Sequence, residues 1–133
     1  MNIYSEIYDF DKLGNIDKIT FISFPYKAEN EIHGFNYKKM CELTSSKVDK
    51  VCRGGFFGGP VESISDFNNQ YYNLMKSTLN EGYMGTEESI FSIMCYKHSD
   101  MVNYFEIESN GLVGKFFEEL KNNNLTAKSE SVR

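Results

Sequence analysis

The chain has 133 residues, the size of one typical domain, and 41% of them are hydrophobic, including 11 Phe and 9 Tyr, which is enough to build a core. The net charge is −5, with 14 Lys and Arg scattered among 19 Asp and Glu, so no basic surface is predicted and a nucleic-acid partner is disfavoured. No apolar stretch approaches the roughly 20 residues that cross a bilayer, so we expect no transmembrane segment.

The first predicted elements lie before residue 44. Residues 4–15 read as a short helix or an irregular lead-in. Residues 18–24 alternate apolar and polar side chains and are rich in β-branched and aromatic residues, which predicts a strand. A polar loop over 26–36 then precedes a short amphipathic helix over 37–43.

The middle of the chain contains the longest predicted helix. Residues 48–53 read as a second strand that leads directly into a glycine-rich loop over 54–59. Pro60 suits the first turn of a helix, because its missing N–H has no intrahelical partner there. A long helix over 61–79 follows, with one apolar face formed by Ile64, Phe67, Tyr71, Leu74, Met75 and Leu79.

The last predicted elements complete an α/β pattern. Thr86 can cap a helix over 87–96, and a strand over 102–107 and a helix over 112–120 follow. Alternating strands and helices predict a mainly parallel α/β arrangement. We expect one domain over 1–121 and a frayed or disordered tail over 122–133.

The cysteines and the first residues indicate a cytoplasmic protein. Cys41, Cys52 and Cys95 are odd in number and have neither metal-ligand nor C-x-x-C spacing, which predicts three free thiols in a reducing compartment. Residues 1–6 have neither the basic nor the apolar region of a signal peptide. His33 and His98 have no partner at metal-ligand spacing, and we interpret both as surface histidines.

The glycine-rich loop is the most unusual feature of the sequence, and its residues are Gly54, Gly55, Phe56, Phe57, Gly58 and Gly59. Glycines are costly inside a strand or helix, but they suit a backbone that bends sharply and approaches a ligand. The alternative is a tight turn whose Phe rings belong to the core. A phosphate-binding P-loop is disfavoured, because Pro60-Val61-Glu62 follows where Gly-Lys-Ser/Thr would be required. Adjacent side chains of an extended segment point to opposite sides, so we expect only one of the two rings to face an open groove.

A pair of carboxylates, Glu87 and Glu88, lies in the first turn of the predicted helix after Thr86. The exposed N–H groups and the positive end of the helix dipole keep such carboxylates ionised, which is the state that a nucleophile or base needs. Acidic residues at helix starts are also ordinary capping residues, so this pair alone leaves both interpretations open.

Taken in order, the glycine-rich loop, the long helix and Thr86-Glu87-Glu88-Ser89 resemble glycosyltransferases of the nucleotide-diphospho-sugar (GT-A) fold. In the family of the blood-group A and B transferases and the α1,3-galactosyltransferases, a similar six-residue loop precedes His-Asp-Glu-Ser. The resemblance implies that Glu88 matches the catalytic Glu, as nucleophile or stabiliser of the oxocarbenium-like centre. It also implies that Glu87 matches an Asp that binds substrate hydroxyls. Thr86 departs from the family's His, so acceptor specificity does not carry over.

Residues 19–120 also resemble the HtrL/YibB-type bacterial and viral proteins assigned to surface-polysaccharide assembly, notably over 53–59 and 82–94. This resemblance implies that the partner is a glycan acceptor. The six-residue loop, and Thr86 with it, would then lie beside the acceptor, with a Phe ring as the platform for one face of a sugar.

A complete GT-A enzyme would also have a nucleotide-binding half and an Asp-x-Asp motif that holds Mn²⁺ or Mg²⁺ on the donor diphosphate. This sequence has only Asp9-Phe10-Asp11, for which helix-start capping is the favoured interpretation. We therefore expect a partial GT-A-like fold without most of the N-terminal nucleotide-binding half, binding no cofactor alone and a nucleotide-sugar donor only with that half. The alternative is a non-catalytic carbohydrate- or partner-binding module, or a degenerate remnant of such an enzyme.

Overall fold

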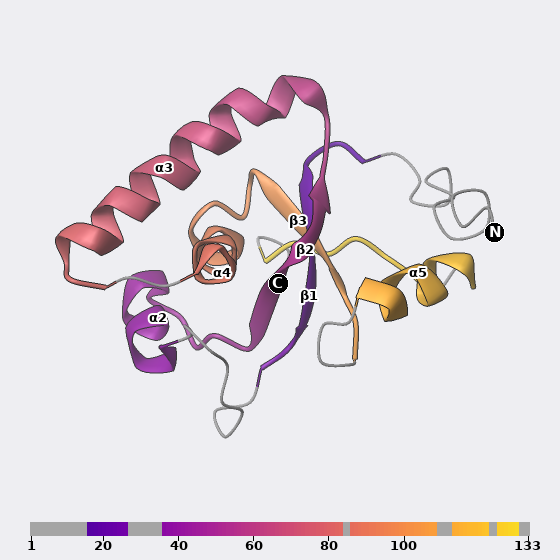
Figure 1. The fold of residues 1–133 in the computed structure, drawn as a ribbon, viewed down its shortest axis with the longest axis horizontal. Coiled ribbons are helices and arrows are strands. Elements are labelled where there is room, and N and C mark those ends of the chain that lie inside the picture. Colours follow the sequence, from indigo (N-terminus) through magenta and orange to yellow (C-terminus); the bar gives the residue numbers. More distant parts are fainter. Residues whose placement is uncertain (1–15, 27–35, 84–85, 109–112, 123–124, 131–133) are drawn as a thin grey trace.

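The computed structural model describes residues 16–26, 36–83, 86–108, 113–122 and 125–130. Within these residues the fold is α/β, as predicted, and is built on a three-stranded sheet of order β2-β1-β3 (Figure 1). The strands are β1 (Ile19–Pro25), β2 (Lys50–Gly58) and β3 (Val102–Glu106). β1 is parallel to β3 and antiparallel to β2, so the sheet is mixed rather than mainly parallel.

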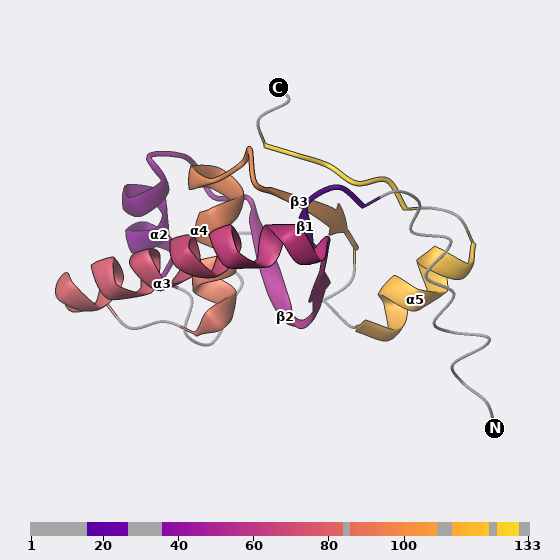
Figure 2. The same cartoon turned by 90° about the horizontal axis from the view of Figure 1, so that it is seen from above.

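Helices cover both faces of this sheet. α4 (Glu87–Lys97) lies against one face, with α2 (Tyr37–Thr44) and α3 (Ile64–Asn80) beside it, and α5 (Val113–Lys121) lies on the opposite side (Figures 1 and 2). A 3₁₀ turn, η2 (Val61–Ser63), joins β2 to α3. None of the helices in the described ranges is long and apolar enough to cross a membrane.

The core has two main parts, one on each face of the sheet. Phe21 and Val102 point toward α4, whereas their neighbours on the other face, Ile22 and Phe105, pack with Phe116 of α5. β1 is the central strand of the sheet, and Ile19 to Phe24 are all buried, so both of its faces are covered. The apolar face predicted from alternation is therefore only half of what this strand buries.

The helices α3 and α4 are buried to different extents. Every residue from Ser89 to Cys95 is buried, because α4 lies between the sheet and the two other helices on its side. In α3, Phe67 and Leu74 of the predicted apolar face are buried, but Ile64 is 52% and Leu79 is 48% exposed. The reason is that α3 packs along α4 rather than on the sheet, and only a narrow stripe of it is covered.

The glycine-rich segment is not a loop, and the prediction that it follows the strand is wrong. Its residues 54–58 form the second part of β2, which ends at Gly58. The pairing is irregular there: Ile22 lies opposite Arg53, and the preceding residue, Phe21, lies opposite Phe57. Residues 54–56 therefore bulge out of the ladder. Glycine is costly inside a regular strand, but it suits a bulge on an edge strand, where the backbone leaves the regular pairing.

In the C-terminal segment, residues 125–130 lie against the domain. Lys128 and Tyr104 exchange two backbone hydrogen bonds of 2.9 Å, and the Ser129 hydroxyl donates to the Ser99 carbonyl at 3.0 Å. The segment thereby covers part of the outer edge of β3. The predicted element over 4–15, Asp9, Asp11 and His33 lie outside the described residues.

Lys50, at the start of β2, connects this segment to the core. Its side chain is only 3% exposed, and its ammonium group donates to Asp49 at 2.9 Å, to the Tyr96 hydroxyl at 3.1 Å and to the Glu130 carboxylate. Burial disfavours the charged form, but these hydrogen bonds outweigh it, and the pKa of Lys50 is raised. The buried lysine therefore stays protonated and depends on carboxylates for compensation.

We expect Glu130→Gln to lower the free energy of unfolding by about 3 kcal/mol, because it removes a carboxylate partner of the buried Lys50 charge. Glu106→Gln is the matched control, since Glu106 pairs with Lys128 of the same segment in an exposed position and should contribute less than about 1 kcal/mol. Urea denaturation of both variants measures the difference. Equal losses of unfolding free energy in the two variants would mean that the Lys50–Glu130 pair stabilises the fold no more than an exposed pair does.

Candidate functional site

The predicted acidic pair and the glycine-rich segment meet where the first turn of α4 crosses β2. The Gly54 N–H donates to Oε1 of Glu88 at 3.1 Å, and Nη1 of Arg53 lies 3.3 Å from Oε2 of the same carboxylate. The Arg53 guanidinium also lies 5.6 Å from the centre of the Phe24 ring. Glu88 is therefore held in one orientation by a backbone donor and a cation.

A second contact, one helical turn further along α4, fixes the same junction. The Ser92 hydroxyl accepts the Cys52 N–H at 3.0 Å and donates to the Glu88 carbonyl at 2.7 Å. Cys52 and Gly54 are two residues apart on an edge strand, so their N–H groups point to the same side. Glu88 and Ser92 are four residues apart, so their side chains share one face of α4. The two spacings match, and α4 supplies an acceptor for each N–H.

Glu87 lies beside this contact. A Cβ atom added to Gly54 would lie 2.9 Å from Oε1 of Glu87, so the glycine leaves the room that this carboxylate occupies. Burial, and then the negative charge of Glu87, raise the pKa of Tyr71 on α3. Thr86 has the extended backbone of an N-cap residue, and its carbonyl accepts the Ser89 and Ile90 N–H groups, but its side chain makes no capping hydrogen bond.

The two Phe side chains point to opposite faces of the sheet, as predicted. Phe56 packs on α5, with its ring centre 4.9 Å from that of Phe116 and 5.9 Å from that of Phe117. Phe57 is 46% exposed and lies on the α4 side, with its ring centre 4.9 Å from that of Phe91. Phe57 is thus on the same side as the acidic pair, and Phe56, a predicted binding residue, is not.

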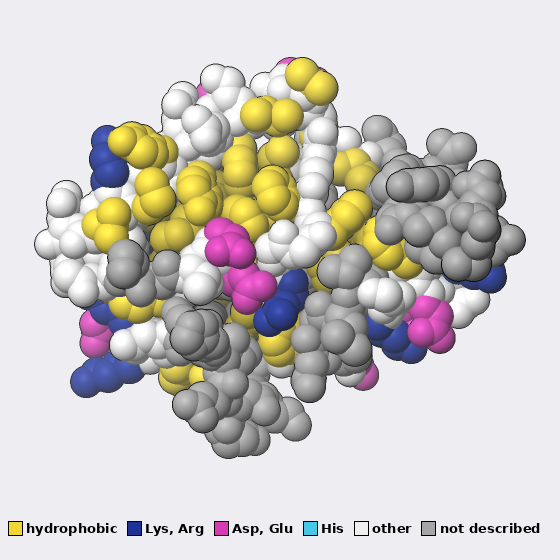
Figure 3. Space-filling view, in the orientation of Figure 1, with side chains coloured by type: hydrophobic (Ala, Val, Ile, Leu, Met, Phe, Trp, Pro, Cys, Tyr) yellow, Lys and Arg dark blue, Asp and Glu magenta, His cyan; other side chains and the backbone are white. Residues whose placement is uncertain are grey.

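Phe57 is one end of a row of aromatic rings that we call the aromatic strip: Phe57, Phe67, Phe91 and Tyr71. The ring centres of Phe57 and Phe67 are 6.2 Å apart, and Tyr71 lies 5.6 Å from Phe91. The strip runs between α3 and the layer formed by β2 and α4. In the space-filling view, hydrophobic side chains gather in the hollow below α3, with acidic side chains and a basic one at its lower edge (Figure 3).

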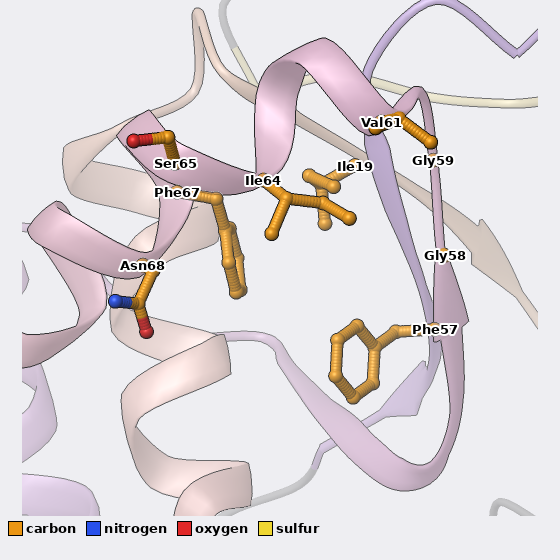
Figure 4. Close-up of a pocket in the computed structure, with 9 residues that line it drawn as sticks. All are labelled: Ile19, Phe57, Gly58, Gly59, Val61, Ile64, Ser65, Phe67 and Asn68. Atoms are coloured by element: carbon orange, nitrogen blue, oxygen red, sulfur yellow. The ribbon is translucent and has the colours of Figure 1, made fainter.

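Two cavities lie along this strip. The larger, of about 710 Å³, is at the Phe57 end between β2 and the start of α3, and the rings of Phe57 and Phe67 point into it (Figure 4). Its other walls include Ile19, Val61 and Ile64. The smaller, of about 220 Å³, is at the Tyr71 end and is lined by Thr86 and Glu87 among others. The larger cavity is within the size range of ligand sites, and it is mostly apolar.

The other predicted binding residues are placed as follows. Gly55 is exposed in the bulge, and Gly58 and Gly59 line the larger cavity. Gly59 is required by its own backbone, because an added Cβ atom would lie 2.8 Å from the Ile19 Cα and 2.9 Å from the Lys18 carbonyl oxygen. The Gly59 backbone therefore makes its close approach to the start of β1 and to the residue before it.

Sequence reasoning missed four residues of the site: Arg53, Ser92, Tyr71 and Phe91. The i, i+4 spacing of Glu88 and Ser92 was visible in the sequence, but nothing local showed which strand the pair would face. Among the described residues, no three His, Cys, Asp or Glu side chains lie close enough together to hold a metal ion.

We expect Gly59→Ala to lower the free energy of unfolding by about 1–3 kcal/mol, because the new methyl group would overlap the backbone of residues 18 and 19. Gly58→Ala is the matched control: no atom lies within 4 Å of its added Cβ, and Gly58 is not in the positive-φ region. It should be neutral or stabilising by up to about 1 kcal/mol. Urea denaturation checks both, and a destabilised Gly58→Ala would contradict the geometry of β2.

Comparison of this chain with models of protein families, with curated proteins and with solved structures finds no match. Any functional conclusion therefore rests on the chemistry of the residues that meet at β2 and α4.

Proposed function

We propose that this chain is the acceptor-side part of a sugar-nucleotide-dependent glycosyltransferase with a partial GT-A-like fold. A glycan acceptor would lie on the aromatic strip, with the hydroxyl that reacts turned toward Glu87 and Glu88. The donor sugar nucleotide, and the divalent cation that such donors require, would be held by a complementary donor-binding half.

The observation that carries the proposal is that Glu87 lines the smaller cavity at the Tyr71 end of the aromatic strip, with Glu88 next to it at the contact of α4 with Gly54. A pyranose ring has an apolar face of C–H groups and a rim of hydroxyls. The exposed Phe57 ring suits the apolar face. Carboxylates accept hydrogen bonds from hydroxyls more strongly than neutral groups do. A sugar is thus the ligand class that suits both the aromatic ring and the carboxylates of this surface.

The two carboxylates have different surroundings, which favours different roles. Glu88 is fixed by Gly54 and Arg53, as a group that stabilises a developing positive charge must be. Glu87 is more exposed and lines the smaller cavity with Thr86, which suits binding of an acceptor hydroxyl.

A second candidate function is a non-catalytic carbohydrate-binding module. The observation that favours it is that both oxygens of Glu88 are engaged within the chain, one by the Gly54 N–H and the other by Arg53. In this case Glu88 only anchors α4 to β2, and the aromatic strip with Glu87 binds a glycan without turnover.

We expect NMR titration with methyl glycosides of common hexoses and N-acetylhexosamines, and with lactose and cellobiose, to shift resonances of the aromatic strip. Phe57→Ala should weaken binding by up to about tenfold, because a stacking ring contributes about 0.5–1.5 kcal/mol. Tyr72→Ala is the matched control, since Tyr72 is exposed to a similar extent on α3 but lines neither cavity. If no sugar shifts the strip, or if Tyr72→Ala weakens binding as much, the proposed site is wrong.

A turnover assay separates the two candidate functions. We expect no transfer from uridine, guanosine or cytidine sugar nucleotides by this chain alone, because the other half neutralises the departing diphosphate. Co-expression with a complementary donor-binding half should give transfer, which Glu88→Gln lowers by orders of magnitude while keeping the shape of the side chain. Glu62→Gln, at the exposed turn η2, is the control. Transfer by the single chain that survives Glu88→Gln would contradict the proposal, and sugar binding without transfer by the completed pair would favour the module.

A further inference from the structure

Two of the three cysteines meet at the junction of β2 and α4. The Sγ atoms of Cys52 and Cys95 are 3.2 Å apart, and the side chains are 0% and 1% exposed. Both are free thiols in this structure, as is Cys41 on α2, which is only partly buried. The pair comes from two elements that are 43 residues apart in the chain, so the fold and not the sequence brings them together.

The thiols belong to the same set of contacts that orients the acidic pair. We call this set the β2–α4 seam: Cys52 and Gly54 of β2 with Glu88, Ser92 and Cys95 of α4. Glu88, Ser92 and Cys95 are four and then three residues apart, so they share one face of the helix. Their partners are the Gly54 N–H, the Cys52 N–H and the Cys52 thiol. Cys95 is thus the third contact of a row in which Glu88 is the first.

We propose that Cys52 and Cys95 are a reversible redox pair, which a peroxide converts to a disulfide that cross-links the β2–α4 seam. The thiolate of one cysteine attacks a peroxide oxygen, so an S–O bond forms, the O–O bond breaks, and hydroxide leaves. The second thiol attacks the resulting sulfenic sulfur, so the S–S bond forms and the S–O bond breaks. With hydrogen peroxide, two thiols and one peroxide give one disulfide and two waters.

The geometry allows the bond with a small movement. A disulfide joins sulfurs at about 2.05 Å, so the two Sγ atoms need to approach by roughly 1 Å. The hydrogen bond with Cys52 and burial both raise the pKa of the Cys95 thiol, which slows attack on the peroxide in the closed fold. Oxidation therefore follows local opening of the β2–α4 seam, and the bond then holds the seam closed.

The test uses the full chain, oxidised with hydrogen peroxide and then freed of it. Thiol titration in denaturant should fall from three thiols per chain to one, and peptide mapping should find a Cys52–Cys95 cross-link. The midpoint of thermal unfolding should rise by about 10 °C, because the bond closes a long loop, and dithiothreitol should reverse the shift. Hydrogen exchange of the Gly54 amide should slow in the oxidised chain.

Variants keep this test decisive. Cys41→Ser should still lose two thiols and show the thermal shift, whereas Cys95→Ala should show neither. If Cys95→Ala fails to fold, peptide mapping of the cross-link in the unaltered chain still shows whether Cys52 and Cys95 are joined. A thiol count that stays at three, or that falls through a bond to Cys41 or between chains, would overturn the proposal, as would a Cys52–Cys95 bond that leaves thermal unfolding and Gly54 exchange unchanged.

Discussion

An edge strand leaves every second backbone N–H without a partner strand, and the arrangement of this site depends on how β2 meets that constraint. The Cys52 and Gly54 N–H groups turn toward α4, where Ser92 and Glu88 accept them. A buried N–H without a partner costs about 1–3 kcal/mol, so these two contacts strongly favour one position of α4 along the strand. Once α4 is fixed in this way, Glu87 lies beside Gly54 and Phe91 lies against Phe57. The contact that covers the edge of β2 with α4 thus also brings the acidic pair and the aromatic strip together.

The sequence was informative where the signal is local. The helices over Tyr37–Thr44 and Glu87–Lys97 and the strand Val102–Glu106 lie within one or two residues of their predicted bounds, because caps, breakers and periodicity specify them. The glycine-rich segment was misjudged because its bulge is stabilised by Glu88, more than thirty residues away. The order of strands, the exposure of Ile64 and the position of residues 125–130 likewise depend on distant partners. Glu87 and Glu88 were identified from a helix start, but the sequence could not show that Arg53 completes the group.

The adjacent Phe56 and Phe57 illustrate how one short segment can contribute to both stability and binding. Phe56 joins the core part between the sheet and α5, and so ties the bulged part of β2 to the far side of the domain. Phe57, on the opposite face, is left half-exposed beside a cavity because α3 leans away from the sheet. The proposed site therefore occupies the space that α3 does not fill, and its rigidity comes from the strand behind it rather than from the helix in front of it.

The covered edges also decide how another protein can join this one. Strand-by-strand extension of a sheet requires a row of free N–H and C=O groups, which is also the route by which edge strands aggregate. Here the Cys52 and Gly54 donors are already engaged, and Lys128 pairs with Tyr104 on the outer edge of β3. At these positions the sheet is no template for a further strand. At these positions a companion subunit would meet the sheet through side chains, so its specificity there would depend on the shape of the two surfaces rather than on backbone pairing, which any extended peptide can imitate.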